Sequence, residues 1–183
     1  ANQTKITFLN LDMEELPLDR VTFYSFLVLC MVLCLPVISH YLRRYPKLLK
    51  FINYLLLFVY FFANLYLTLL SRPTNLYHHM ELTPFWSYKA AMYDLELREE
   101  VLLNILLYVP FGYLIHYAFP KLKWWTIVVS GFLMSGFTET IQLFFKLGLC
   151  EVDDLISNTL GTIIGVGLYR GYKRIVSKKK GAA

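Results

Sequence analysis

The chain has 183 residues, of which 57% are hydrophobic, and carries a formal net charge of +5. Soluble domains are about 45–50% apolar. Here the apolar residues form continuous runs that one water-soluble core of this size could not bury. The three cysteines, Cys30, Cys34 and Cys150, follow no CxxC or Cys/His spacing, so they indicate neither a disulfide framework nor a zinc site.

Five segments are long and apolar enough to cross the hydrocarbon layer of a membrane, which takes about 20 residues of helix. They cover residues 21–42, 51–70, 101–119, 124–145 and 155–172. We therefore predict an all-α, polytopic bundle of about five transmembrane helices, located as a multi-pass protein in the cell membrane. Residues 1–20 are expected to form an extracellular or interfacial segment, residues 21–172 the bundle, and residues 173–183 a basic cytoplasmic tail.

The charges separate to the two sides of this predicted bundle. The first and third loops and the C-terminal tail share one side, which holds 12 of the 18 basic residues and no acidic residue. The other side holds 12 of the 13 acidic residues, and Glu139 lies within the fourth span. Because basic residues mark cytoplasmic loops, we predict the N-terminus outside and the C-terminus inside.

Polar side chains collect near the predicted outer ends of three spans. Glu139 lies about 10 Å below the outer end of the fourth span, at 1.5 Å per residue, and Gln142 shares its helix face. Asp154 and Asn158 begin the fifth span, and Asn104 lies near the start of the third. We predict a shallow pocket lined by these five residues, with Glu139 and Asp154 as candidate catalytic groups, since intramembrane carboxylates usually mark function. The alternative is an interhelical hydrogen-bond network that only stabilises the bundle.

Small residues predict close packing between helices. The fifth span contains Gly161-x-x-x-Gly165, and the fourth offers Gly131-x-x-x-Ser135. Such spacing lets two helix backbones approach closely. We expect the fourth and fifth spans to pack together within one chain, and a homodimer through Gly161 and Gly165 is the alternative.

Other ligands have weaker support. His78, His79 and Glu81 lie together in the outer loop, but no fourth ligand is specified, so we predict no metal site and no cofactor. The basic tail is expected to bind anionic membrane lipid. No nucleic-acid partner is predicted, because no motif for one is present.

The polar residues and their flanks resemble the VanZ-like family over about residues 82–169. The resemblance rests on four segments that occur in the family's order: Leu82-Thr83-Pro84-Phe85, Asn104 with Val109-Pro110-Phe111-Gly112, Glu139-Thr140-Ile141-Gln142, and Glu151-Val152-Asp153-Asp154 with Asn158-Thr159-Leu160-Gly161. Glu151 stands where the family often has Asp, and Lys146 is the only basic residue near the place where many members carry an Arg.

The resemblance implies a bacterial membrane protein linked to lowered susceptibility to teicoplanin-like lipoglycopeptides. It adds Thr83, Pro84 and Phe85 to the predicted ligand-binding residues. Two functions stay open. One is a non-enzymatic factor that binds the lipoglycopeptide or another envelope ligand at the outer face. The other is a membrane enzyme that uses Glu139 and Asp154 as an acid/base pair on a lipid-linked cell-wall precursor.

Overall fold

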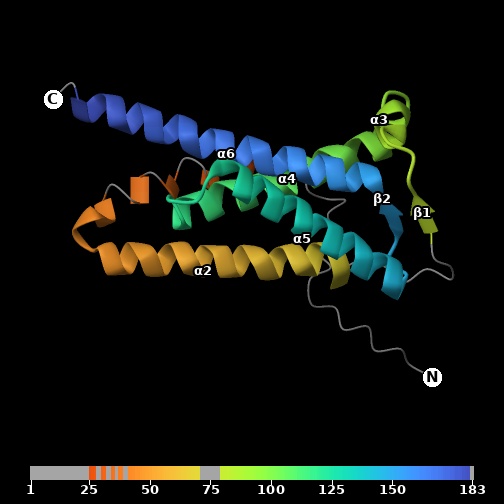
Figure 1. Ribbon diagram of the computed structural model, residues 1–183, viewed down its shortest axis with the longest axis horizontal. Coiled ribbons are helices and arrows are strands. Elements are labelled where there is room, and N and C mark those ends of the chain that lie inside the picture. Colours follow the sequence, from red (N-terminus) through yellow and green to blue (C-terminus); the bar gives the residue numbers. More distant parts are fainter. Residues whose placement is uncertain are drawn as a thin grey trace, which may run out of the picture.

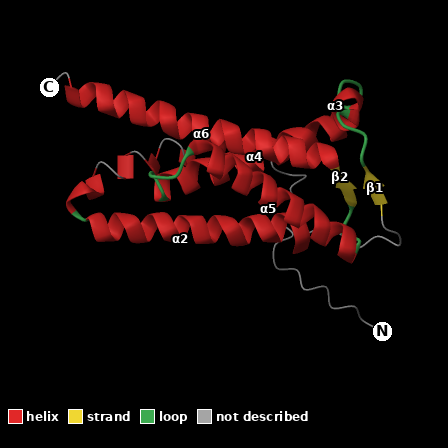
Figure 2. Ribbon diagram, viewed as in Figure 1, coloured by secondary structure: helices red, strands yellow, loops and turns green. Residues whose placement is uncertain are grey.

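The computed structural model describes residues 25–27, 30–31, 34–35, 37–38, 41–70 and 79–181. These residues form a bundle of long helices with a small cap at one end (Figures 1 and 2). The predicted all-α membrane class is confirmed. The predicted N-terminal segment lies outside the described residues, and the first predicted span is described only at scattered positions.

Four long helices build the described bundle. They are α2 (Pro46–Leu65), which the π-helical turn η3 (Tyr66–Leu70) continues, α4 (Leu95–Ala118), α5 (Trp124–Phe145) and α6 (Val152–Gly181). A short 3-10 turn, η2 (Leu42–Arg44), precedes α2. Among the described residues, α2 with η3, α4 and α5 are long and apolar enough to cross a membrane. The predicted count of five spans therefore stays a prediction.

Helix α6 differs most from its predicted span. It contains residues 155–172 but begins three residues earlier and continues to Gly181, so the predicted basic tail is helical. Acidic residues occupy its first turn, and basic residues occupy its last turns. These charged turns explain why α6 does not reach the hydropathy of the other three helices.

The cap consists of α3 (Trp86–Ala90) and two short parallel strands, β1 (His79–Glu81) and β2 (Leu149–Glu151), in which Met80 pairs with Cys150. In Figure 1, α2 and α5 run toward this cap, and α4 and α6 run away from it. The far end, called the basic end below, holds the loop between α4 and α5 and the last turns of α6. Where the structure describes the chain, the predicted separation of charge along the sequence is therefore also a separation in space.

Glycines seat α6 directly against α4. A Cβ atom at Gly161 would overlap the backbone carbonyl oxygen of Ile105, and one at Gly165 would overlap that of Val109. These two glycines therefore face α4, the predicted third span, which the sequence left open because spacing along one helix does not identify its partner. A homodimer seam through Gly161 and Gly165 would need α4 to move away.

Helix α5 does pack on α6, as predicted, but through its own glycine. A Cβ atom at Gly131 would overlap the side chain of Thr162 on α6. Helix α6 therefore contacts α4 on one face and α5 on another. This arrangement brings the cap ends of three helices together and sets the position of the candidate site.

A candidate polar site at the cap end

A buried carboxylate ties the cap to the first turn of α6. Asp153 is 1% exposed. It accepts hydrogen bonds from the backbone N–H of Phe85 (2.6 Å), the backbone N–H of Ser87 (2.8 Å) and the hydroxyl of Ser87 (2.7 Å). Phe85 has φ 65°, a left-handed conformation that bulky residues rarely adopt. Asp153 thus holds a strained segment that leaves the Phe85 ring half-exposed.

The segment with the predicted ligand-binding residues Thr83, Pro84 and Phe85 therefore belongs to the cap, and Asp153 holds its end in place. The hydroxyl and the backbone N–H of Thr83 hold the pKa of Glu81 below its usual range, and the N–H lies 2.8 Å from Oε1 of Glu81. A second connection between α3 and α6 is the hydrogen bond between the hydroxyls of Tyr88 and Ser157, which are 2.7 Å apart. Sequence reasoning missed Asp153 as the residue that positions this segment.

Asn104 and Asp154 meet as predicted. The Asn104 Nδ2 donates to Oδ1 of Asp154 over 2.5 Å and joins α4 to α6. One turn deeper on α6, Nδ2 of Asn158 donates to the hydroxyl of Ser135 on α5 over 2.8 Å. Both amides are therefore interhelical contacts, and Ser135, which is fully buried, is a partner that the sequence analysis did not identify.

Glu139 lies buried on α5, beside strand β2. Its Oε2 accepts a hydrogen bond from the backbone N–H of Glu151 over 3.1 Å. Burial and the neighbouring carboxylate of Glu139, which also accepts the thiol proton, raise the pKa of Cys150 to about 11. The carboxylates of Asp154 and Glu151 act on the thiol in the same direction. Glu139 thus contacts the thiol, and Asp154 acts on it through its charge alone.

The charges of the same two carboxylates also reach Tyr108 of α4. Its hydroxyl is fully buried, lies against Thr138 and Ser135, and is within the electrostatic reach of Glu139 and Asp154. Within the described residues, however, no group completes a hydrogen bond to this oxygen, and Oδ1 of Asn158 likewise has no partner. Because buried polar atoms are nearly always paired, these two mark the place where a polar ligand or water would bind.

Gln142 faces a different helix from Glu139. Its Nε2 donates to the backbone carbonyl of Thr68 in η3 over 2.8 Å. A chain of side-chain bonds continues from Thr68 to the carbonyl of Asn64, from Asn64 to the hydroxyl of Tyr60, and from Tyr60 to the carbonyl of Leu107 on α4, at 2.8, 3.3 and 2.9 Å. This polar ladder fixes α2 to α4 and α5. The sequence signal that could have found it is the helical spacing of Asn64 and Thr68 in an apolar run.

The predicted residues therefore divide into three groups. Asn104, Glu139, Asp154 and Asn158 lie around Tyr108, Ser135 and Cys150, and this set is called the polar cluster below. Gln142 belongs to the α2 ladder, and residues 83–85 belong to the cap. No group of three His, Cys, Asp or Glu residues able to hold a metal ion is found where the structure is described. His78 lies outside that region, as does the side chain of His79.

Comparison with known proteins gives one family. The model of the VanZ/LLP1 family matches residues 51–176. Protein VanZ of Enterococcus faecium is 28% identical over 81 residues, which cover 44% of this chain and 50% of that relative. The chain thus spans about half the length of this curated relative. No solved structure matches the chain. Because the family model covers well over half of the sequence, the chain belongs to the VanZ/LLP1 family.

Proposed function

We propose that this protein is a multi-pass cell-membrane protein that lowers susceptibility to teicoplanin-like lipoglycopeptides. It does so by binding the drug, or another ligand of the cell envelope, at the polar cluster on the outer face. Family membership and the distant relative VanZ support the class of function. The basic end would face the cytoplasm, which places the cap and the polar cluster outside.

One observation carries the proposal: the charges of Glu139 and Asp154 both reach the buried hydroxyl of Tyr108, which, like Oδ1 of Asn158, has no hydrogen-bond partner among the described residues. A ligand amine would be attracted by the carboxylates through charge-assisted hydrogen bonds. A ligand N–H or O–H could donate to Oδ1 of Asn158, and the phenol of Tyr108 could donate to a ligand oxygen. Glycopeptides carry all of these groups, so the chemistry of the cluster fits such a ligand.

The cap supplies an apolar surface next to this polar cluster. Leu82, Phe85, Met92 and Tyr93 are all exposed there. At the membrane surface such side chains would lie among lipid headgroups or against the apolar part of a ligand. Thr83 and Pro84, between two of them in the chain, would contribute to the same contact.

The test is teicoplanin susceptibility in a bacterial host that expresses the protein. Glu139→Gln and Asp154→Asn keep the size of each side chain and remove its charge. We expect each to lower the protective effect at least about fourfold, because a charge-assisted hydrogen bond is lost. Thr140→Ala is the matched control, since Thr140 is exposed on the same helix and bonds only to the carbonyl of Gly136. Full protection by both charge variants, at equal membrane abundance, would exclude the proposed site.

A membrane enzyme acting on a lipid-linked envelope substrate is the second candidate. Tyr108 favours it, because a phenol close to two carboxylates could take part in general acid–base catalysis. Incubation of the purified protein with lipid-linked cell-wall precursors, with and without divalent cations, would reveal turnover as a change in precursor mass. An unchanged mass under all conditions would leave binding as the function.

A further inference from the structure

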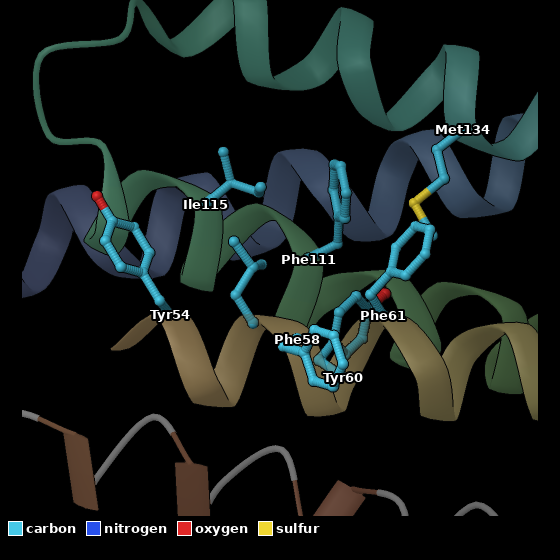
Figure 3. Close-up of a pocket in the computed structure, with 8 residues that line it drawn as sticks. Tyr54, Phe58, Tyr60, Phe61, Phe111, Ile115 and Met134 are labelled. Carbon is cyan, nitrogen blue, oxygen red and sulfur yellow. The ribbon is translucent and has the colours of Figure 1, made fainter. Parts of the chain in front are cut away.

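The basic end of the bundle contains a buried histidine between α4 and α6. Its neighbour in the chain, Ile115, lines a groove formed by apolar residues of α2, α4 and α5 (Figure 3). His116 lies about 100° further round α4 and follows by one turn Gly112, which meets the backbone of α6. The imidazole therefore faces α6, where it stacks on the ring of Tyr169 with the ring centres 4.5 Å apart.

Two cations of α6 lie near this imidazole. Lys173 is three residues from Arg170 and four from Tyr169, and these spacings bring side chains together on a helix. The charges of Arg170 and Lys173 both act on the imidazole of His116. Both cationic side chains are exposed. A ligand at the surface of the bundle can therefore reach both of them next to the stacked pair of rings.

The two helices offer these groups no counter-charge. No acidic residue lies between Glu100 and Glu139 or after Asp154, so neither α4 nor α6 carries a carboxylate at the basic end. His116 is only 7% exposed, and its Nδ1 has no hydrogen-bond partner among the described residues. Buried polar atoms are nearly always paired. Two cations beside such an atom fit an anion that comes from outside the chain.

The depth of these groups in the membrane indicates the source of the anion. His116 lies two residues before the end of α4 at Ala118, which is about 3 Å along the helix axis. Trp124 and Trp125 begin α5 at the same end, and each is about half-exposed. Exposed tryptophans are typical of the level of the lipid headgroups. At that level the anion within reach is the phosphodiester of a lipid.

We infer that Arg170, Lys173 and the imidazole of His116 bind the phosphodiester of an anionic phospholipid, in the leaflet at the basic end. The guanidinium can donate two parallel hydrogen bonds to a phosphate, and the ammonium binds it as a point charge. Phosphatidylcholine fits less well, because its choline would place a positive charge beside both cations. The site lies at the opposite end of the bundle from the polar cluster and does not depend on the proposed function. It gives the predicted attraction of the tail for anionic lipid a defined place, where the bundle meets the tail.

The experiment measures by native mass spectrometry how tightly the first added lipid binds to the full chain in detergent. The probes are dioleoylphosphatidylglycerol, which is anionic, and dioleoylphosphatidylcholine, which has no net charge. One variant combines Arg170→Gln with Lys173→Gln. Its matched control combines Arg44→Gln with Lys47→Gln, because these exposed residues have the same types and spacing and lie at the start of α2. We expect the first variant to bind phosphatidylglycerol at least about fivefold more weakly than wild type, and the control to stay within about twofold.

A third variant tests the imidazole. His116→Phe keeps a ring that can stack on Tyr169 and removes both nitrogens. We expect it to bind phosphatidylglycerol at least about threefold more weakly than wild type. Unchanged binding of phosphatidylcholine shows that the variant is folded. Wild-type affinity of His116→Phe for phosphatidylglycerol would overturn a site built around the histidine.

Three other results would also overturn the inference. Equal losses in the two double variants would mean that lipid responds only to the total charge of the basic end. Equal affinity of the wild-type protein for the two lipids would show that the site does not select an anionic headgroup. Displacement of phosphatidylglycerol by inorganic phosphate, but not by chloride at the same ionic strength, would assign the site to free phosphate instead of a lipid.

Discussion

Ser87 donates two hydrogen bonds to a single carboxylate oxygen, Oδ2 of Asp153, one from its backbone N–H and one from its hydroxyl, at 2.8 and 2.7 Å. The two residues are 66 positions apart in the chain. With the further bond from the N–H of Phe85, this contact fixes the cap on the first turn of α6. It is the link between the surface that would meet a ligand and the helix that carries Asp154 and Asn158.

Asp153→Ala should therefore loosen the cap. The change leaves three donors without their acceptor, and hydrogen bonds to a charged group contribute about 1.5–3 kcal/mol each. We expect the free energy of unfolding to fall by about 3 kcal/mol or more. Thermal unfolding in detergent measures this loss, and amide hydrogen exchange over residues 85–88 shows where it occurs. Ser87→Ala, which removes one of the three bonds, is the graded control. Asp153→Ala should be clearly less stable than Ser87→Ala. Equal stabilities would contradict the role of Asp153 in fixing the cap on α6.

Two glycines of α6 allow a second prediction, on the packing of α6 against α4, with a matched control. Gly161 meets the backbone of α4, whereas Gly167 has nothing within 4 Å of a Cβ atom. Gly161→Leu should separate α4 from α6 and cost about 3 kcal/mol or more of stability, because overpacking against backbone has little room to relax. Gly167→Leu should stay within about 0.5 kcal/mol of wild type. Unfolding midpoints of the two variants in the same detergent decide the matter, and the reverse order would refute the α4–α6 packing.

Cys150 reports on the polar cluster through its reactivity. Its pKa of about 11 means that the thiol stays protonated at neutral pH, and the alkylation rate should rise with pH up to that value. Glu139→Gln removes a negative neighbour, which lowers the pKa of the thiol and speeds alkylation at pH 8–9. The measurement uses iodoacetamide in a Cys30→Ser, Cys34→Ser background. Glu100→Gln, at an exposed position near the start of α4, should leave the rate unchanged. An unaltered rate in Glu139→Gln would show that Glu139 does not face the thiol.

The long helices were the most predictable part of the fold. The residues of α5 agree with the predicted fourth span at both ends, because an apolar run bounded by Lys123 and Lys146 has few alternatives. Helix α4 begins six residues before its predicted span, at Leu95. Asp94 caps it there by accepting from the N–H groups of Glu96 and Leu97 at 2.9 and 3.3 Å. This capping pattern is visible in the sequence, whereas hydropathy alone places the boundary too late.

The partners of individual polar residues could not be predicted in the same way. Asp153 and Asp154 are consecutive, so they point about 100° apart around α6, and spacing does not say which one faces the cap. In the structure Asp153 accepts hydrogen bonds from the cap, whereas Asp154 accepts one from Asn104. Cys150 carried no motif, and Ser135 belonged only to a helix-packing motif. They join the cluster because β2 brings Cys150 to Glu139 and α6 brings Asn158 to Ser135. The level of the polar cluster follows from the sequence, but its contacts depend on how the helices rotate against each other.

The orientation of the cap is the claim on which the proposed function depends. Tyr93, in the cap, is 90% exposed, and Leu122, in the loop between α4 and α5 at the basic end, is 41% exposed. In a chain freed of its own cysteines, Tyr93→Cys and Leu122→Cys can be labelled in intact cells with a maleimide that does not cross membranes. Labelling of Tyr93→Cys in intact cells, and of Leu122→Cys only after the membrane is permeabilised, is the predicted result. Labelling of Leu122→Cys but not Tyr93→Cys in intact cells would place the polar cluster in the cytoplasm and contradict the proposed function.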